Sequence, residues 1–328
     1  CQMPMGGAGS SVMIEIDGSS HSGSGTIVRY GVAFASLLGK PVLIHNVRAA
    51  RKKPGLRPQH LTSVKACAEL CGARTEGLAV YSREFAFWPG GGIRGGSYRW
   101  DIRTAGSTTM LALSILPLAA RAGSPLTARI TGGLFQDFAP SPYHMLHVLL
   151  PVLARMGLAA TVKVVRPGYV PAGGGVLELT VTPVEGRLRA VELLEQGTIE
   201  EVSGVAISSH LEDRRVSHRM ASVCEKVLRK ADLRARIETR YDREAARPGA
   251  GLAVWAESST GCRLGADCAG AVRRTSENIG RTVSRGFLED WKTGATVDRH
   301  LADQLVLFAA LAKGVTRFRV PRLTEHLE

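Results

Sequence analysis

The amino-acid sequence predicts a mixed α/β (α+β) protein. Segments with strand and helix patterns follow one another as strand–helix–strand–helix–strands, an order typical of this class. Three predicted helices end at a glycine (Gly72, Gly157 and Gly314) and each leads into a strand, which suggests an internal repeat. The second interval between these glycines is nearly twice the first, and the excess predicts an inserted subdomain at residues 184–272. Residues 1–183 and 273–328 would then form one discontinuous repeat domain. Because helices commonly end in glycine, the repeat is a hypothesis at this point.

The first three elements are expected between residues 13 and 47. Residues 13–16 are expected to form a short strand before a Gly/Ser turn at residues 18–25. Residues 26–38 have a helical pattern. Residues 41–47 alternate and are rich in β-branched side chains, which favours a second strand.

A basic loop follows this second strand. Residues 48–58 are punctuated by two prolines and a glycine and carry five cations: Arg48, Arg51, Lys52, Lys53 and Arg57. Residues 61–71 then form a predicted helix that stops at Gly72. Cations between a strand and a helix N-terminus suit a phosphate, because backbone N–H groups and the positive end of the helix dipole lie beside them. No Asp or Glu occurs from residue 18 to residue 68. The alternative is a basic surface loop without a specific ligand.

The remaining elements are read from the same signals. Strands are expected at residues 74–80, 84–88 and 97–103. The sequence Ala105–Gly106–Ser107 leads into a helix that runs to about residue 122, and a strand at 126–131 ends at two glycines. A helix from about residue 141 to 156 precedes strands at 159–165 and 176–181. The predicted insertion, rich in Glu and Arg, has a strand at 199–208, a helix at 214–230 and strands at 233–239 and 251–256. The last helix is expected at 301–313.

Composition narrows the function classes. The chain of 328 residues has a net charge of +13 and a pI near 9.9, so a nucleic acid or a nucleotide is the natural partner. A membrane surface is the weaker alternative, because no basic amphipathic helix stands out. The longest apolar run, residues 110–120, is too short to span a bilayer, and we expect no membrane segment.

The cysteines predict a reducing compartment. Cys67 and Cys71 stand four residues apart on a predicted helix, but no second pair with zinc-type spacing occurs, so buried free thiols are favoured over a metal site. Residues 1–12 lack the hydrophobic stretch of a secretory signal. We therefore expect a cytoplasmic protein.

Six blocks of the sequence resemble the RNA 3′-terminal phosphate cyclase family. They are IDGS (residues 16–19), GTIVR (25–29), IHNVRAARKKPGLRPQHLTSVKA (44–66), IRGGSYRWDI…TAGSTT (93–109), RPGYVPAGGG (166–175) and HLADQLVLFAALA (300–312). The resemblance runs from about residue 14 to residue 327 with the blocks in order. It implies three repeats of a two-helix, four-stranded sheet unit resembling the C-terminal domain of a translation initiation factor. It also implies a small inserted α/β domain before the last repeat.

The resemblance also implies an activity. A histidine would attack the α-phosphorus of ATP and form a histidine–AMP intermediate, in the presence of Mg²⁺ or Mn²⁺. AMP would pass to the 3′-phosphate of an RNA, and the neighbouring 2′-OH would close a 2′,3′-cyclic phosphate. A neutral imidazole is a competent nucleophile near pH 7, and arginines can stabilise the charge on the phosphoryl group.

Individual residues take their expected roles from the same resemblance. The nucleophile would be His326, in Thr324–Glu325–His326; the alternative is a terminal histidine without a role. The expected ATP- and phosphate-binding residues are Arg29, Arg48, Arg51, Gln59, His60, His300, Asp303 and Gln304. Gln59 and His60 could instead open the helix, and Asp303 could be a solvated or capping residue.

Several positions depart from the family pattern. Ser22 stands where a metal-binding glutamate is expected, so the ligands of the expected Mg²⁺ or Mn²⁺ are not identified by the sequence. His300 replaces a tyrosine that packs on adenine, and Leu113 replaces a glutamine. A non-catalytic cyclase-like protein that binds RNA is therefore the alternative function. A third possibility is an enolpyruvyl transferase on a similar repeat fold, which the RPGYVPAGGG and LADQ blocks argue against.

Overall fold

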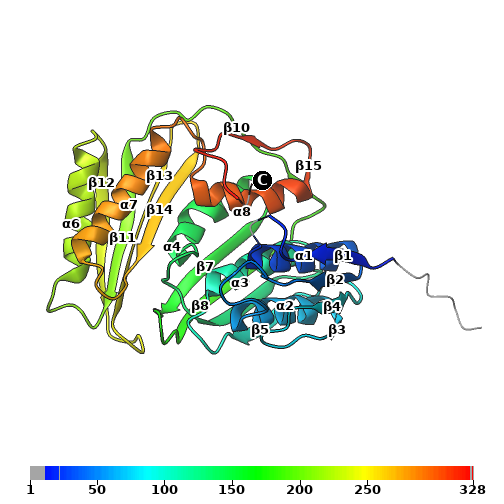
Figure 1. Ribbon diagram of the computed structural model, residues 1–328. Helices are drawn as coiled ribbons and strands as arrows, with labels where there is room; N and C mark the ends of the chain where they lie inside the picture. Colours follow the sequence, from blue (N-terminus) through cyan, green and yellow to red (C-terminus); the bar gives the residue numbers. More distant parts are fainter. Residues whose placement is uncertain (1–11, 22, 326, 328) are drawn as a thin grey trace, which may run out of the picture.

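The computed structural model describes residues 12–21, 23–325 and 327, and it confirms the mixed α/β class (Figure 1). These residues form three four-stranded sheets and two short two-stranded ones. Within them, no helix is both long and apolar enough to cross a membrane.

The first sheet contains the strands around the basic loop. Its elements are β1 (Ile14–Asp17), α1 (Gly25–Leu38), β2 (Val42–His45), α2 (Pro58–Cys71), β3 (Arg74–Glu76) and β4 (Phe85–Trp88). The strand order is β1-β2-β4-β3; β1 and β2 are parallel and the other pairs antiparallel. The Ser24 hydroxyl caps α1, and α1 and α2 end at Gly39 and Gly72 in the left-handed region that glycine favours.

The second sheet repeats this pattern of pairing. Its elements are β5 (Gly96–Asp101), α3 (Thr108–Ala119), β6 (Leu126–Gly132), a helical segment, β7 (Ala159–Arg166) and β8 (Gly175–Thr182). The order is β5-β6-β8-β7, again with one parallel pair followed by two antiparallel pairs.

The helical segment of the second sheet is not a uniform α-helix. It consists of α4 (Pro142–His144), the π-helix η1 (Met145–Leu149) and α5 (Leu150–Arg155). The Leu150 N–H donates to the Met145 carbonyl, five residues back. Pro151 has no N–H to donate and its ring crowds the preceding turn, which explains why regular α-helical bonding is interrupted just before it.

The third sheet forms a unit with its own core. Its elements are β11 (Glu201–Ser209), α6 (Val216–Arg229), β12 (Arg234–Asp242), β13 (Gly249–Glu257), β14 (Arg263–Ala269) and α7 (Ser276–Trp291). The order is β12-β11-β13-β14, and α6 and α7 cover one face (Figure 1). Buried residues from Val202 to Phe287 form this second core, so α7, which lies beyond the predicted inserted range 184–272, packs with this unit.

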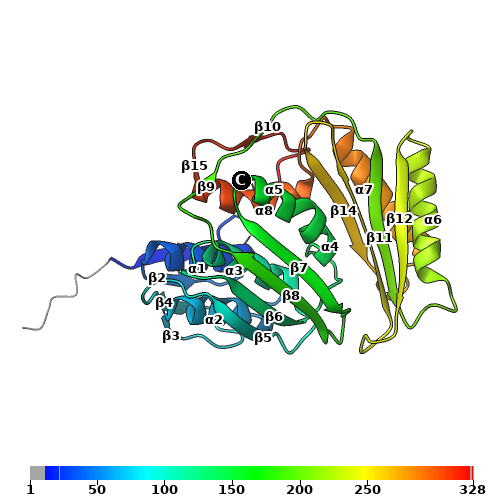
Figure 2. The ribbon, with the colours of Figure 1, turned by 180° about the vertical axis from the view of Figure 1, so that it is seen from behind.

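Helix α8 (Arg299–Leu311) lies between this unit and the first sheet (Figures 1 and 2). Two short parallel pairs flank it, β9 (Leu188–Arg189) with β15 (Ala312–Lys313) and β10 (Glu192–Leu193) with β16 (Arg317–Phe318). The predicted helix at 301–313 therefore ends two residues early, because residues 312 and 313 pair as a strand.

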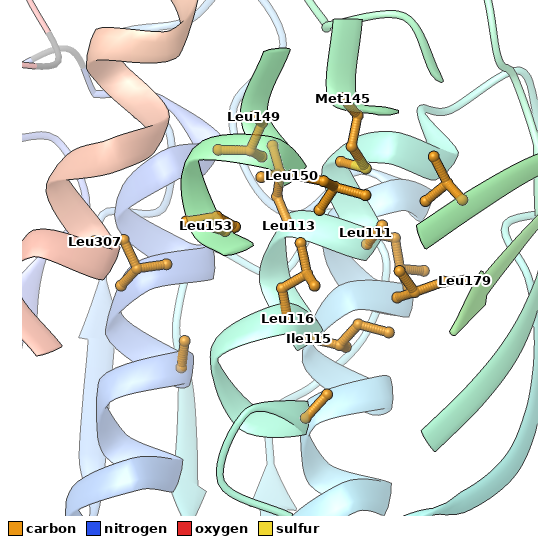
Figure 3. Close-up of a cluster of buried hydrophobic side chains, with 14 of the residues drawn as sticks. Leu111, Leu113, Ile115, Leu116, Met145, Leu149, Leu150, Leu153, Leu179 and Leu307 are labelled. Carbon is orange, nitrogen blue, oxygen red and sulfur yellow. The ribbon is translucent and has the colours of Figure 1, made fainter. Parts of the chain in front are cut away.

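The main core joins α3 to its neighbours. Figure 3 shows apolar side chains of α3 meeting those of the helical segment, β8 and α8: Leu111, Leu113, Ile115, Leu116, Met145, Leu149, Leu150, Leu153, Leu179 and Leu307. The Cys67 and Cys71 thiols of α2 lie in the same core and are free, as expected.

Candidate active site

A buried arginine lies at the centre of the basic region. Arg29, on α1, is only 6% exposed, and its Nη2 donates to the Thr26 hydroxyl at 3.1 Å. Among the residues that the structure describes, none of the ion pairs with carboxylates includes Arg29. Burial, aided by the charge of Arg48, lowers the pKa of Arg29 to about 10. A buried cation without a carboxylate calls for an anionic ligand.

His60 lies against this arginine. Its Nδ1 accepts the backbone N–H of Arg57, the N-cap residue of α2, at 3.2 Å. Through this nitrogen His60 also has the structural role at the start of α2 that was its alternative. Burial and the charges of Arg29, Arg48 and Arg57 lower the pKa of His60 to about 3. The ring is therefore neutral near pH 7. Because an N–H can only donate to Nδ1, the ring proton must be on Nε2.

The amide of Gln59 faces that proton. The Ser107 N–H donates to Gln59 Oε1 at 3.0 Å, which leaves the amide nitrogen facing His60 Nε2 at 3.4 Å. Both groups are then donors, and neither can accept from the other. An oxygen of an anion placed between them and Arg29 would accept from all three.

Gly25 makes this approach possible. A Cβ atom on Gly25 would lie 2.2 Å from His60 Nε2 and 3.1 Å from Arg29 Nη1. Only a glycine therefore lets the start of α1 lie against the imidazole. His60 Nε2 and Arg29 Nη1 both lie beside the backbone of Gly25.

The basic loop surrounds these groups. Arg48 has a left-handed backbone (φ 53°), and its Nη1 donates to the carbonyls of Lys53 and Gly55 at 2.8 and 2.9 Å, so it also closes the loop on itself. Arg51 lies exposed on the same loop, and its charge contributes to the lowered pKa of Arg48. The structure thus brings Arg29, Arg48, Gln59 and His60 together, with Arg51 at the rim.

A cleft of about 720 Å³ extends from Arg29 to α8. His300, Asp303 and Gln304 line it on α8, one turn apart or less. The Tyr30 hydroxyl donates to the Asp303 carbonyl at 3.2 Å and so ties α8 to α1. The cleft is also lined by residues 136–140 and, from the third unit, by Asp267, Cys268, Ala269, Arg274, Asn278 and Thr282.

Two side-chain oxygens in this cleft are unpaired. Gln304 is 7% exposed and its Oε1 is buried without a hydrogen-bond partner among the described residues; the same holds for Gln136 Oε1. A buried acceptor without a donor costs about 1–3 kcal/mol, so a ligand with N–H or O–H groups would be favoured here. Sequence reasoning missed Gln136, which belongs to no motif.

A buried ion pair fixes the start of α8. The Asp298 carboxylate accepts the N–H groups of His300, Leu301 and Gly265 and faces His144 Nε2 at 3.1 Å. Burial opposes its charge, but His144 and these bonds lower the pKa of Asp298 to about 2. Burial alone would lower the pKa of His144; the Asp298 carboxylate reverses this and raises it. Sequence reasoning missed this pair, although an Asp before a helical pattern is an N-cap signal.

The predicted nucleophile, His326, lies outside the described residues, as does Ser22. Thr324, two residues before His326, donates its hydroxyl to the Asp303 carboxylate. The segment that leads to His326 is therefore anchored on the side of α8 that lines the cleft.

The described residues do not form a metal cage. No group of three His, Cys, Asp or Glu side chains gathers among them. The cleft carboxylates are engaged: Asp137 pairs with Arg274, Asp267 accepts the Ser141 N–H, and Asp303 accepts from Thr324. We therefore assign no step to a metal ion.

Comparison with known proteins gives one consistent result. The family model for RNA 3′-terminal phosphate cyclase matches residues 20–328. Three similar curated proteins carry that name. The one from Hyperthermus butylicus is 41% identical over 320 residues, covering 96% of this chain and 88% of the relative. Those from Nostoc punctiforme and Methanopyrus kandleri are 38% and 35% identical, covering 96% of this chain and 91% and 90% of the relatives. The solved enolpyruvyl transferase NikO from Streptomyces tendae matches 53% of this chain and 33% of its own at 15% identity and a TM-score of 0.31, too low to bear on function.

Proposed function

The chain belongs to the RNA 3′-terminal phosphate cyclase family, and from this premise we propose that it is an ATP-dependent ligase-type enzyme that converts the 3′-terminal phosphate of an RNA to a 2′,3′-cyclic phosphate. One observation carries the proposal. Among the described residues, a buried arginine without a carboxylate partner lies beside two N–H donors that face each other, and a cleft leads from it to α8.

The proposed reaction has three balanced steps. A ring nitrogen of His326 attacks the α-phosphorus of ATP, so that a P–N bond forms and the P–O bond to pyrophosphate breaks. An oxygen of the RNA 3′-phosphate attacks the same phosphorus, the P–N bond breaks, and AMP passes to the RNA. The adjacent ribose 2′-OH then attacks the terminal phosphorus, loses its proton and expels AMP. The last step gains from the fixed proximity of the two groups.

The described residues divide these tasks. Arg29, His60 and Gln59 would bind phosphate oxygens through charge and N–H groups, with Arg48 and Arg51 adding charge around them. On α8, exposed His300 would stack on the adenine, and Gln304 Oε1 would accept an N–H of the nucleotide. Asp303, through its bond to Thr324, would hold the segment that carries the nucleophile.

The domain organisation is part of the same proposal. The shared strand order of the sheets β1–β4 and β5–β8 supports two repeats of the initiation-factor-like unit. A third repeat that contains α8 stays a prediction. The separate core of β11–β14, α6 and α7 supports an inserted domain. The free Cys67 and Cys71 thiols support a cytoplasmic location.

A labelling experiment tests the activity. The protein is incubated with α-³²P-labelled ATP and either Mg²⁺ or Mn²⁺, with and without an RNA that ends in a 3′-phosphate. We expect acid-labile label on the protein without RNA, transfer of that label when RNA is added, and a cyclic phosphate product. The His326→Ala variant should show none of these. Label that persists in that variant would place the nucleophile elsewhere.

The second candidate is a non-catalytic protein that binds RNA 3′ ends. It is favoured by Leu113, an apolar residue that lines the cleft where the family resemblance predicts a glutamine. Absence of protein labelling with both metals, together with retained RNA binding, would select this function.

A further inference from the structure

We propose that Phe138 is the stacking platform for the terminal nucleobase of the RNA substrate. This inference rests on the proposed function and names a specificity-determining contact for it. Phe138 lies in the loop after β6 and lines the cleft that Arg29 and α8 share.

The ring is presented to solvent although it is large and apolar. Phe138 is fully exposed, whereas other phenylalanines in the described part, such as Phe85, Phe87, Phe287 and Phe308, are fully buried. Its backbone adopts φ 64°, the left-handed region, which non-glycine residues rarely occupy. An exposed aromatic ring on a strained backbone needs an explanation, because neither feature stabilises the free protein.

Bonds on both sides of Phe138 anchor the backbone of this loop. On one side, Arg274 of the third unit binds both oxygens of Asp137 at 2.8 and 3.0 Å and also donates to the Ala269 carbonyl at 2.6 Å. On the other side, the Thr109 hydroxyl donates to the Pro140 carbonyl at 2.7 Å. The backbone of Phe138 thus lies between two anchored segments, and its ring extends from them into solvent.

The position of the Phe138 ring favours RNA rather than ATP as the ligand that it contacts. Leu113 and Gln304 are only 7% exposed and line the interior of the cleft, where a nucleotide would be enclosed. A fully exposed ring lies at the mouth. ATP ends within the site, whereas an RNA bound by its 3′-phosphate must leave through the mouth, with its terminal base nearest. A phenyl ring stacks on any base and makes no hydrogen bond to it, so this contact would bind the base without reading its identity.

The test compares two substrates and three forms of the protein. One RNA ends in a nucleoside 3′-phosphate, and the other is identical but lacks its terminal base. We expect the wild-type protein to cyclise the first with a kcat/KM roughly 5- to 150-fold higher, the range for loss of one stacked base. In Phe138→Ala this ratio should fall to near one, through loss on the intact RNA only, and Phe138→Trp should restore it. Val272→Ala, which removes another highly exposed apolar side chain outside the cleft, should keep the wild-type ratio.

Other outcomes would overturn the inference. An unchanged ratio in Phe138→Ala would show that the ring does not hold the base. A loss of protein labelling by ATP alone in that variant would assign the ring to ATP instead. If the wild-type protein itself forms no AMP adduct, the proposed activity fails. The role of Phe138 is then decided by the equilibrium binding of the same two RNAs to the wild-type protein and to Phe138→Ala.

Discussion

Replacing Arg29 by Met should make the ligand-free protein more stable and abolish its response to ATP. Methionine keeps an unbranched apolar stem, is shorter than arginine and carries no charge. In the folded protein the Arg29 guanidinium is buried, donates to Thr26 and has no carboxylate partner among the described residues. Its charge therefore opposes folding until an anion binds.

The magnitude follows from the pKa. Lowering the pKa of Arg29 from 12.5 to about 10 corresponds to roughly 3 kcal/mol, at about 1.4 kcal/mol per pKa unit. Because the folded pKa lies below the unfolded one, this penalty applies in full at pH 7 and is relieved only as the pH rises through 10. Loss of the bond to Thr26 offsets about 1 kcal/mol. The net gain in the free energy of unfolding should be about 1–3 kcal/mol.

The assay is chemical and thermal unfolding in a buffer without phosphate, sulfate or nucleotide. Arg48→Met is the matched control, because the Arg48 side chain donates to two loop carbonyls and its loss should destabilise the protein by about 1–3 kcal/mol. Addition of ATP at about 100 times its Kd should stabilise the wild-type protein by roughly 2.7 kcal/mol and leave Arg29→Met unchanged.

Two results would refute the reasoning. If Arg29→Met is less stable than the wild-type protein without ligand, Arg29 is a structural residue with a partner that satisfies its charge. If the variant is more stable but still gains stability from ATP, the buried cation is real, but it does not bind the nucleotide.

Three further predictions concern the surroundings of this site. Asp298→Ala should lower the free energy of unfolding by roughly 3–5 kcal/mol, because it leaves His144 buried without its partner. In the wild-type protein the pair should stabilise most between about pH 4 and 6.5, with loss as the pH falls through the Asp298 pKa near 2 or rises through the raised pKa of His144; denaturant titrations across pH measure this. Gly25→Ala should abolish labelling by ATP with the fold retained by circular dichroism, while Gly91→Ala, in open space, should change neither. Gln304→Leu should leave the melting temperature of the ligand-free protein equal or higher and weaken ATP binding measured by calorimetry; a clear drop in that temperature would mean that the amide has a structural role.

The fold could be predicted from the sequence where local signals are strong. Helices α1 and α2 end where Gly39 and Gly72 allow a left-handed residue, and α2 was expected to stop at the second of these. Strand β14 and helix α7 were not predicted. Helix α7 contains Gly280 and Gly286, which disfavour helix. A Cβ on Gly280 would lie 2.6 Å from the Met220 carbonyl, so this glycine permits the close packing of α7 on α6, a tertiary reason that no local pattern reveals.

The candidate site could be predicted where it depends on motifs. The GTIVR block, the basic loop and the LADQ block pointed to Arg29, Arg48, Asp303 and Gln304. In the structure Arg29, Asp303 and Gln304 line one cleft, and Arg48 lies close enough to Arg29 to lower its pKa. The second function of Arg48, which closes the loop through two carbonyls, depends on a backbone conformation and was not foreseen. Gln136 was missed because it belongs to no sequence motif, and only the fold places it in the cleft.

The polar groups of this site share one property, which is that the free protein leaves them unsatisfied. Arg29 is charged and buried, the N–H groups of His60 and Gln59 face each other, and the Gln304 acceptor has no donor in the part of the chain that the structure describes. Each would be selected against in a purely structural core. Three of these side chains are held by another bond that is satisfied: Arg29 donates to Thr26, His60 accepts from Arg57, and Gln59 accepts from Ser107. A ligand that is anionic at one end and carries N–H donors at the other would satisfy all of them at once. A nucleotide has that distribution of groups, and binding it would need little rearrangement of the donors already in place.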